Sequence, residues 1–148
     1  MKSLFLIFIA GILLTVNLSA QMEQDFDLQD YRWNDRVLLI FSPNAIYTEL
    51  TSTMEMVRKN QKGFNERDLK VFHVLENIGN SSGDNVLQKA DAQNLRDRFD
   101  VGSSDFKIIL IGKDGSEKMR SSEAITKNTL FEVIDAMPMR RLEMKEDG

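Results

Sequence analysis

The chain has 148 residues, of which 42% are hydrophobic and 28% charged, a balance typical of a globular protein rather than a disordered one. It contains no cysteine, which excludes disulfides, cysteine-bound metal and every thiol-based redox or nucleophilic mechanism. A single histidine, His73, excludes a multi-histidine metal site, and a net charge of −4 leaves no basic field that could hold nucleic acid or anionic lipid.

Residues 1–20 have the pattern of a cleavable secretory signal peptide. Lys2 supplies a positive charge, residues 4–16 are almost entirely apolar, and Ala20 offers a small residue at the cleavage site. The apolar stretch is shorter than the ~17 to 20 residues that a membrane span needs, although an uncleaved N-terminal anchor is the alternative. We therefore expect an exported protein, periplasmic or extracellular, with no membrane span after cleavage.

The mature chain is expected to begin with an exposed lead-in, residues 21–30, which is rich in carboxylates. The first strand is predicted for residues 37–41, Val-Leu-Leu-Ile-Phe, because an apolar run without alternation suits a strand that is covered on both faces. Ser42, Pro43 and Asn44 follow this run and are expected to end the strand.

A helix is predicted for residues 46–62, and Gly63 is expected to end it. Its apolar positions recur every three or four residues, which places them on one face: Ile46, Leu50, Met54 and Val57. The second strand is predicted for residues 69–75, which are rich in β-branched and aromatic side chains. Glycine, asparagine and serine then indicate a loop at residues 77–85, and a second helix follows at residues 90–99.

A hairpin is predicted near the end of the chain. Residues 106–111 form its first strand, and the dipeptide Asp114-Gly115 forms a turn in which both central positions need a positive φ. Residues 117–120 form the second strand. This strand is short and polar, as expected of a strand at the edge of a sheet.

The last predicted helix spans residues 126–136, with Thr126 as its N-cap and Pro138 as its stop. The resulting order is β-α-β-α-β-β-α, which we interpret as two parallel crossovers followed by a hairpin and a covering helix. This order predicts one thioredoxin-like α/β domain over residues 31–144, with a four-stranded mixed sheet and helices on both faces. Residues 145–148 are expected to form a tail.

The segment where a thioredoxin-like fold carries its reactive thiol holds no sulfur here. That segment joins the first strand to the first helix, and residues 42–48 of this chain read Ser-Pro-Asn-Ala-Ile-Tyr-Thr. Such folds also commonly place a cis-proline before the third strand, whereas residues 102–105 contain no proline. We therefore expect no thiol redox catalysis, and we expect the protein not to be an enzyme.

Three other motifs have a structural and a functional interpretation, and in each case the structural one is favoured. His73 lies on a predicted strand, where a hydrogen-bonded structural role is favoured over a general base. Residues 103–105, Ser-Ser-Asp, indicate a loop rather than a serine nucleophile. The acidic residues Asp25, Asp27 and Asp30 lack the spacing of an EF-hand calcium site, so a solvated segment is favoured. No metal and no cofactor are expected.

A first candidate binding cluster combines two aromatic and two guanidinium groups directly before the first strand: Tyr31, Arg32, Trp33 and Arg36. This composition is enriched at recognition hot spots. In the alternative interpretation, Trp33 closes the open end of the core and the arginines pair with Asp30 and Asp35.

A second candidate cluster surrounds Pro138 and consists of Met137, Met139, Arg140 and Arg141. In its structural interpretation the methionines fill gaps in the packing and the arginines complement a helix dipole. The remaining candidate binding residues lie at the end of the first strand and are Ser42, Pro43 and Asn44.

Four segments of the chain resemble the signature of a domain of unknown function: residues 32–41, 67–69, 109–115 and 134–141. This domain occurs in small exported bacterial proteins and in vertebrate sushi-repeat and coiled-coil-domain-containing matrix proteins. It is described as a peroxiredoxin-like domain without the peroxidatic cysteine. The resemblance covers residues 28–144 and implies a thioredoxin-like fold and a secreted setting, but it implies no activity, cofactor or catalytic residue.

We expect a non-catalytic exported module that contacts a protein, a peptide or an envelope or matrix polymer. One alternative is an enzyme that uses oxygen and nitrogen groups, which requires His73 or Asp105 to converge with arginines around a cavity. Another is an oligomerising envelope stress or adhesion factor, which an exposed apolar patch at Met137 and Met139 would favour.

Overall fold

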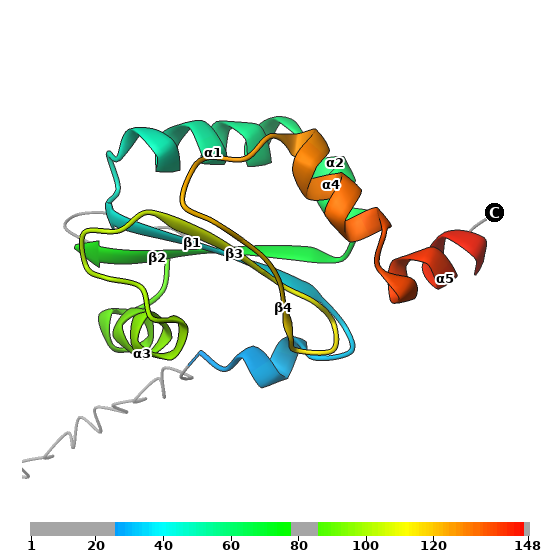
Figure 1. The fold of residues 1–148 in the computed structure, drawn as a ribbon, viewed down its shortest axis with the longest axis horizontal. Helices are drawn as coiled ribbons and strands as arrows, with labels where there is room; N and C mark the ends of the chain where they lie inside the picture. The colour runs from blue at the N-terminus through cyan, green and yellow to red at the C-terminus, as the bar shows by residue number, and fades with distance from the viewer. Residues whose placement is uncertain (1–25, 78–85, 147–148) are drawn as a thin grey trace, which may run out of the picture.

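The computed structural model describes residues 26–77 and 86–146 (Figure 1). The predicted signal peptide, the first five residues of the lead-in and nearly all of the predicted loop lie outside the described residues. The elements, in chain order, are η1 (Leu28–Tyr31), β1 (Arg36–Asn44), α1 (Thr48–Lys59), α2 (Gln61–Asn65), β2 (Leu69–Asn77), α3 (Lys89–Phe99), β3 (Lys107–Ile111), β4 (Glu117–Ser121), α4 (Lys127–Asp135) and α5 (Pro138–Glu146).

The four strands form one mixed sheet in the order β2-β1-β3-β4, with β4 at an edge as predicted. Strand β1 is parallel to β2, but it is antiparallel to β3, so the chain makes one parallel crossover and not two. The second predicted crossover is wrong because an apolar run specifies a buried strand without specifying the direction in which that strand runs.

Helices cover both faces of the sheet, as predicted (Figure 1). Helices α1, α2 and α4 pack on one face, where Leu38 and Ile40 of β1 point. Helix α3 and η1 pack on the other face, where Leu39 and Phe41 point. All four of these side chains are fully buried, which confirms that the apolar run of β1 is covered on both sides.

The predicted first helix differs from the observed one at both ends. Ile46 precedes α1 and is 88% exposed, so it does not belong to the core face. The helix breaks at Asn60, and Gly63 lies inside the short helix α2 instead of ending α1. A Cβ atom at Gly63 would lie 2.7 Å from the ring of Phe131, so glycine serves here to let α2 approach α4 closely.

The hairpin between β3 and β4 is confirmed, but its turn differs from the predicted type. Gly115 has a φ of 81°, whereas Asp114 is not among the residues with positive φ. The amide of Gly115 donates to the carbonyl of Gly112 at 2.9 Å, and the carboxylate of Asp114 accepts from the amide of Ser116 at 3.0 Å. Asp114 thus stabilises the turn as a hydrogen-bond acceptor and needs no unusual backbone conformation.

The C-terminal part contains a helix that was not predicted. Thr126 caps α4 as expected and accepts from the amide of Thr129 at 3.1 Å. Helix α4 ends before Pro138, but Pro138 is also the first residue of α5. Proline suits this position because the first turn of a helix needs no amide donor. Helix α5 reaches Glu146, so the predicted tail begins inside it.

In the described part of the lead-in, Asp27, Gln29 and Asp30 are exposed, whereas the two apolar side chains pack against the sheet. Leu28 is buried, and the ring of Phe26 lies 4.8 Å from that of Phe72 in β2. The two apolar side chains of this acidic segment therefore anchor it to the α3 face of the sheet. Within the described residues, no helix combines the length and apolar character that a membrane crossing requires.

Candidate functional site

The two candidate clusters, which are about a hundred residues apart in sequence, meet beside the turn between β3 and β4. The amide of Trp33 donates to the carbonyl of Lys113 in this turn at 2.6 Å. Nearby lies a cavity of about 190 Å³, which we call the Arg36 cavity. Its lining combines the turn, three basic side chains and the start of α5: Arg36, Gly112, Lys113, Asp114, Lys118, Met137, Pro138 and Met139.

Trp33 is an exposed side chain on a constrained backbone. It is 61% exposed, which shows that the interpretation as a plug at the end of the core is wrong. Its φ of 69° is left-handed, a conformation that costs a non-glycine residue roughly 1 to 2 kcal/mol. Arg32 lies 5.1 Å from the centre of the indole and donates through Nε to the carbonyl of Asp114 at 3.1 Å, instead of pairing with Asp30.

Tyr31 has a packing role. Its ring lies 5.7 Å from that of Phe26 and 5.3 Å from that of Phe72. Burial, with the nearby charges of Asp30 and Asp35, raises the pKa of its hydroxyl. Tyr31 therefore packs with Phe26 and Phe72 and is less exposed than Trp33.

Arg36 is the most deeply buried member of the first cluster, at 1% exposure. Its Nη1 and Nη2 donate to the two carboxylate oxygens of Glu143 at 3.2 and 3.0 Å, and Nη1 also donates to the carbonyl of Arg67 at 2.8 Å. The expected pairing with Asp35 is wrong, since Asp35 lies 3.7 Å from Lys70 instead. Sequence analysis missed Glu143 because nothing near it in the chain indicates its partner.

Glu143 is the centre of an ion-pair network. Besides Arg36, it contacts Lys113 at 2.8 Å and Arg140 at 3.3 Å. Burial alone would raise the pKa of Glu143, but hydrogen bonds from Arg36 and Lys113 and their positive charges lower it to about 2. Burial likewise disfavours the charged form of Lys113, yet its bonds to Asp68 and Glu143 raise its pKa overall.

The arginines of the second cluster have different roles. Arg140 is buried and lies 3.5 Å from Asp135, whereas Arg141 is exposed. Asp135 also accepts two hydrogen bonds from Arg67, at 3.0 and 2.6 Å, and Arg67 lies 3.9 Å from the ring centre of Phe131. Arg140 thus helps to join α5 to α4, while the half-buried methionines line the Arg36 cavity.

The third candidate group, residues 42–44, does not join the other two; these residues were expected to end the first strand, but β1 continues through them to Asn44. The hydroxyl of Ser42 is buried and donates to the carbonyl of Asn44 at 2.9 Å. The side chain of Asn44 accepts from the amide of Ile46 at 3.1 Å. The carbonyl of Ser42 accepts from Arg96, a buried side chain that sequence analysis also missed. These contacts shape the strand end and present no reactive group.

Neither His73 nor Asp105 lines the Arg36 cavity or the larger cavity between α1, α2 and β2. Burial lowers the pKa of His73, and its Nε2 has no partner among the described residues. Asp105 accepts from the amide of Gly102 at 3.1 Å, which fits the loop interpretation of this segment. Among residues 26–77 and 86–146, no three acidic or imidazole groups cluster closely enough to hold a metal ion.

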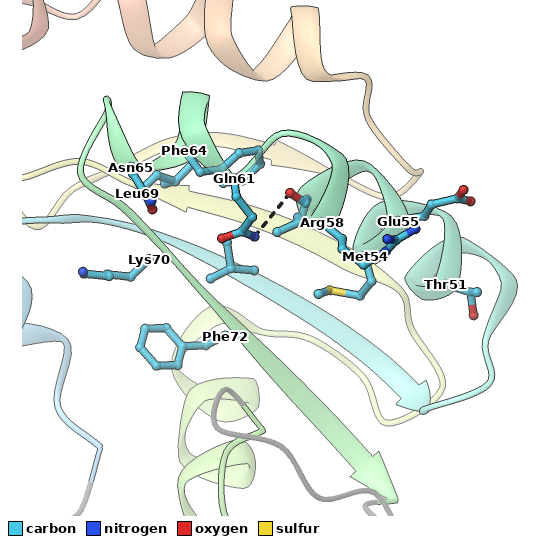
Figure 2. A pocket seen from close by; sticks show the side chains of 12 residues that line it. Thr51, Met54, Glu55, Arg58, Gln61, Phe64, Asn65, Leu69, Lys70 and Phe72 are labelled. Carbon is cyan, nitrogen blue, oxygen red and sulfur yellow. Dashed lines mark hydrogen bonds between the residues drawn. The ribbon is translucent and has the colours of Figure 1, made fainter.

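A larger cavity of about 720 Å³ lies between helices α1 and α2 and strand β2 (Figure 2). Figure 2 shows Met54 and Arg58 from α1, Gln61 and Phe64 from α2, and Lys70 from β2 around it. Gln61 donates to the carbonyl of Val57 at 3.3 Å, and Glu55 is held by Lys59 at 2.6 Å. The lining offers apolar and polar side chains for contact, but no acid and base that are paired with each other. The cavity could not be predicted from the sequence because its lining comes from three separate elements.

Comparisons with known proteins agree with this fold. A family model described as a domain of unknown function (DUF4174) matches residues 27–143. The chain is similar to the reduced 2-Cys peroxiredoxin of Plasmodium vivax, with 16% identity and a TM-score of 0.60 over 78% of this chain and 72% of that one. It is also similar to the thioredoxin domain of a thiol-disulfide oxidoreductase from Bacteroides vulgatus, with 15% identity and a TM-score of 0.54 over 73% of this chain and 81% of that one. These likenesses confirm the predicted thioredoxin-like fold and, at such identities, establish the fold alone.

Proposed function

This chain belongs to the family of the domain of unknown function DUF4174, and we propose that it is a non-catalytic binding module on a thioredoxin-like scaffold. The absence of cysteine from the sequence removes the chemistry for which such scaffolds are usually used. The proposal includes export directed by residues 1–20 and contact with a protein, a peptide or an envelope or matrix polymer.

The observation that carries the proposal is the exposure of Trp33 on a strained and anchored backbone. Its left-handed conformation is unfavourable for folding, and the exposed indole recovers little of that cost through packing. Because the backbone of Trp33 is already fixed and an indole has only two side-chain torsions, binding through it costs little conformational entropy. The flanking guanidinium of Arg32 suits a partner with an acceptor group beside a flat apolar surface.

The first test measures affinity for a partner captured from the envelope fraction of the source organism. Trp33 is the only tryptophan in the chain, so its fluorescence reports directly on contact in the unaltered protein, and calorimetry compares its affinity with those of the variants. Trp33→Ala should lower affinity by more than about 1 kcal/mol while leaving the melting temperature nearly unchanged. Ile46→Ala, which removes an apolar side chain that is even more exposed, at 88%, just beyond the other end of β1, is the control and should bind as the unaltered protein does.

Two results would contradict the proposal. Equal affinities of the Trp33 and Ile46 variants would show that the indole makes no specific contact. Turnover of peroxide or of another substrate that a single substitution abolishes would favour the enzymatic alternative.

Self-association is a second candidate role, favoured by the exposed apolar side chains of Leu142 and Met144 on α5. An exposed apolar patch at Met137 and Met139 would also have favoured this role, but both side chains are half-buried and line the Arg36 cavity. Sedimentation that shows only a monomer across a hundredfold range of concentration would exclude this role.

A further inference from the structure

Strand β2 is an edge of the sheet, and its outer side is only partly covered. It lies at the end of the strand order β2-β1-β3-β4. Beyond it, Val86 forms a single bridge to His73, and the amide of Leu87 donates to the carbonyl of His73 at 3.2 Å. No other described residue outside β1 pairs with β2, so the first half of β2 has an open side.

The main-chain groups of Val71 point toward this open side. The amide of Arg36 in β1 donates to the carbonyl of Asp68 at 2.7 Å, whereas the carbonyl of His73 accepts from beyond the sheet. Main-chain groups alternate in direction along a strand, so even-numbered positions of β2 face β1 and odd-numbered positions face outward. Among the described residues, none pairs with the outward amide and carbonyl of Val71. Such an edge is a template for another extended chain.

The larger cavity, of about 720 Å³, follows the same edge (Figure 2). Leu69 and Val71 line it and belong to the core on the α1 and α2 side of the sheet. Lys70 and Phe72 also line it, although they lie on the opposite face of β2. A cavity that touches both faces of one strand must pass around the edge of that strand. The structure thus has a groove between helices and an open strand, an arrangement that takes an extended peptide as an added strand.

The alternation of side chains in an added strand decides which of them enter the cavity. Every second side chain would face α1 and α2, where Met54, Val57 and Phe64 supply apolar lining, and the intervening ones would face the side of Lys70. The volume lies within the roughly 300 to 1,000 Å³ of common ligand sites, so a side chain fits together with its main chain. The lining therefore selects an apolar residue at a position that faces the helices.

The charges around the cavity favour an acidic residue on the same face of the added strand. Glu55 is paired with Lys59 at 2.6 Å, and Lys70 lies 3.7 Å from Asp35. Arg58 lines the cavity from α1, is exposed and forms no ion pair with another described residue. The pKa of Glu55 is lowered mainly by the hydrogen bond from Lys59, and the charge of Arg58 contributes least. One positive charge beside the groove is therefore left without its own carboxylate.

We propose that the open edge of β2 binds an extended peptide segment in which an acidic residue lies two positions from an apolar one. The main chain of the segment pairs with Val71, the apolar side chain enters the cavity, and the carboxylate meets Arg58. This site goes beyond the contact surface at Trp33, and neither depends on the other.

The probe is the capped pentapeptide Glu-Thr-Leu-Thr-Glu. Its leucine has a glutamate two positions away on either side, so both strand directions place a carboxylate near Arg58. The probe is titrated into the purified protein at constant ionic strength, and the amide of Val71 is followed by NMR. We expect a saturable shift of this resonance and slower hydrogen exchange, because the amide gains an acceptor.

Two N-methylated forms of the probe test main-chain pairing while the side chains stay the same. One form carries a methyl group on the leucine nitrogen, and the other carries one on each threonine nitrogen. Because the N–H groups of a strand alternate in direction, only one of these sets faces β2. One form should therefore bind about tenfold more weakly than the probe, and the other should bind nearly as well as the probe.

Arg58→Gln should weaken binding of the probe about two- to fivefold, as expected for an exposed ion pair. It should leave the affinity for the uncharged peptide Gln-Thr-Leu-Thr-Gln unchanged. The matched control is Arg98→Gln, because Arg98 is an exposed arginine on α3, on the other side of the sheet, and does not line the cavity. This variant should bind the probe as the unaltered protein does.

The proposal is overturned if the probe gives no saturable shift at Val71, if the two N-methylated forms bind equally well, or if the two arginine variants weaken binding equally. It is also overturned if the Val71 amide is already protected from exchange in the free monomer, because another segment of the chain then pairs with it. Protection that rises with protein concentration in the absence of peptide would assign the edge to a second copy of the chain and would overturn it as well.

Discussion

Glu143→Gln tests whether the ion-pair network around the Arg36 cavity stabilises the fold. The substitution keeps the size of the side chain, removes its charge and turns an amide NH₂ toward donors. Arg36 then stays buried without its carboxylate, and Lys113 and Arg140 lose the same partner. The interaction joins α5 to β1 and to the hairpin, so its loss should lower the stability of the whole domain.

Two routes give a similar magnitude for this loss. Removing one partner of a fully buried ion pair costs about 3 to 5 kcal/mol. Glu143 is 22% exposed and Arg36 keeps its bond to the carbonyl of Arg67, so water and this bond reduce the cost to about 2 to 3 kcal/mol. Independently, lowering the pKa of Glu143 from 4.5 to about 2 corresponds to about 3 kcal/mol before solvent screening.

The pH dependence has a definite sign. Because the pKa of Glu143 is lower in the folded than in the unfolded chain, its contribution is fully present above about pH 5. It is lost as the pH falls toward 2, where the folded carboxylate takes up its proton. The difference in free energy of unfolding between the unaltered protein and Glu143→Gln should therefore shrink over this range.

Urea unfolding followed by circular dichroism at pH 7, 4 and 2.5 measures this difference. At pH 7 the melting temperature should also fall by roughly 6 to 15 °C. Glu117→Gln is the control, because its ion pair with Arg120, at 2.8 Å, is about one-third exposed at both partners and should contribute less than about 1 kcal/mol. If Glu143→Gln costs no more than this control, or if its cost does not change with pH, the reasoning is refuted.

Two further substitutions test buried polar groups. Arg96→Met should lower the free energy of unfolding by about 3 kcal/mol, because three carbonyl oxygens from three separate segments lose their donor; a loss below about 1 kcal/mol in urea unfolding would contradict this. Burial lowers the pKa of His73, so the unfolded chain takes up the imidazole proton first and stability should fall as the pH drops from 7 to 5. His73→Asn should abolish this slope, since the chain has no other histidine, and a slope that persists in the variant would assign it to another group.

Elements that depend on neighbours in the chain were predicted well. The apolar run of β1, the short polar edge strand β4 and the cap of α4 by Thr126 all follow from local pattern. Errors arose where a distant contact overrides that pattern. Gly63 lies inside α2 instead of ending α1, and its missing side chain leaves room for the ring of Phe131. Strand β3 runs antiparallel to β1, a direction that its sequence does not indicate.

The candidate site was predicted in its parts but not in its assembly. Trp33 and Arg36 were both selected from one cluster, yet one is exposed and the other is almost fully buried. The methionines of the second cluster were selected without any indication that they line a cavity with Arg36. Glu143, the carboxylate that organises this end of the molecule, was not selected at all.

The sequence by itself determined that the protein performs no thiol chemistry and that its strands and helices follow a thioredoxin-like order. The first conclusion depends on composition alone. The second depends on apolar residues that recur every two or 3.6 positions, a pattern that can be read from residues close together in the chain. Only the tertiary structure decided which charges are buried and which groups meet. Arg36 and Glu143 are 107 positions apart, and the free energy of their contact comes from burial that the folded sheet and α5 create together.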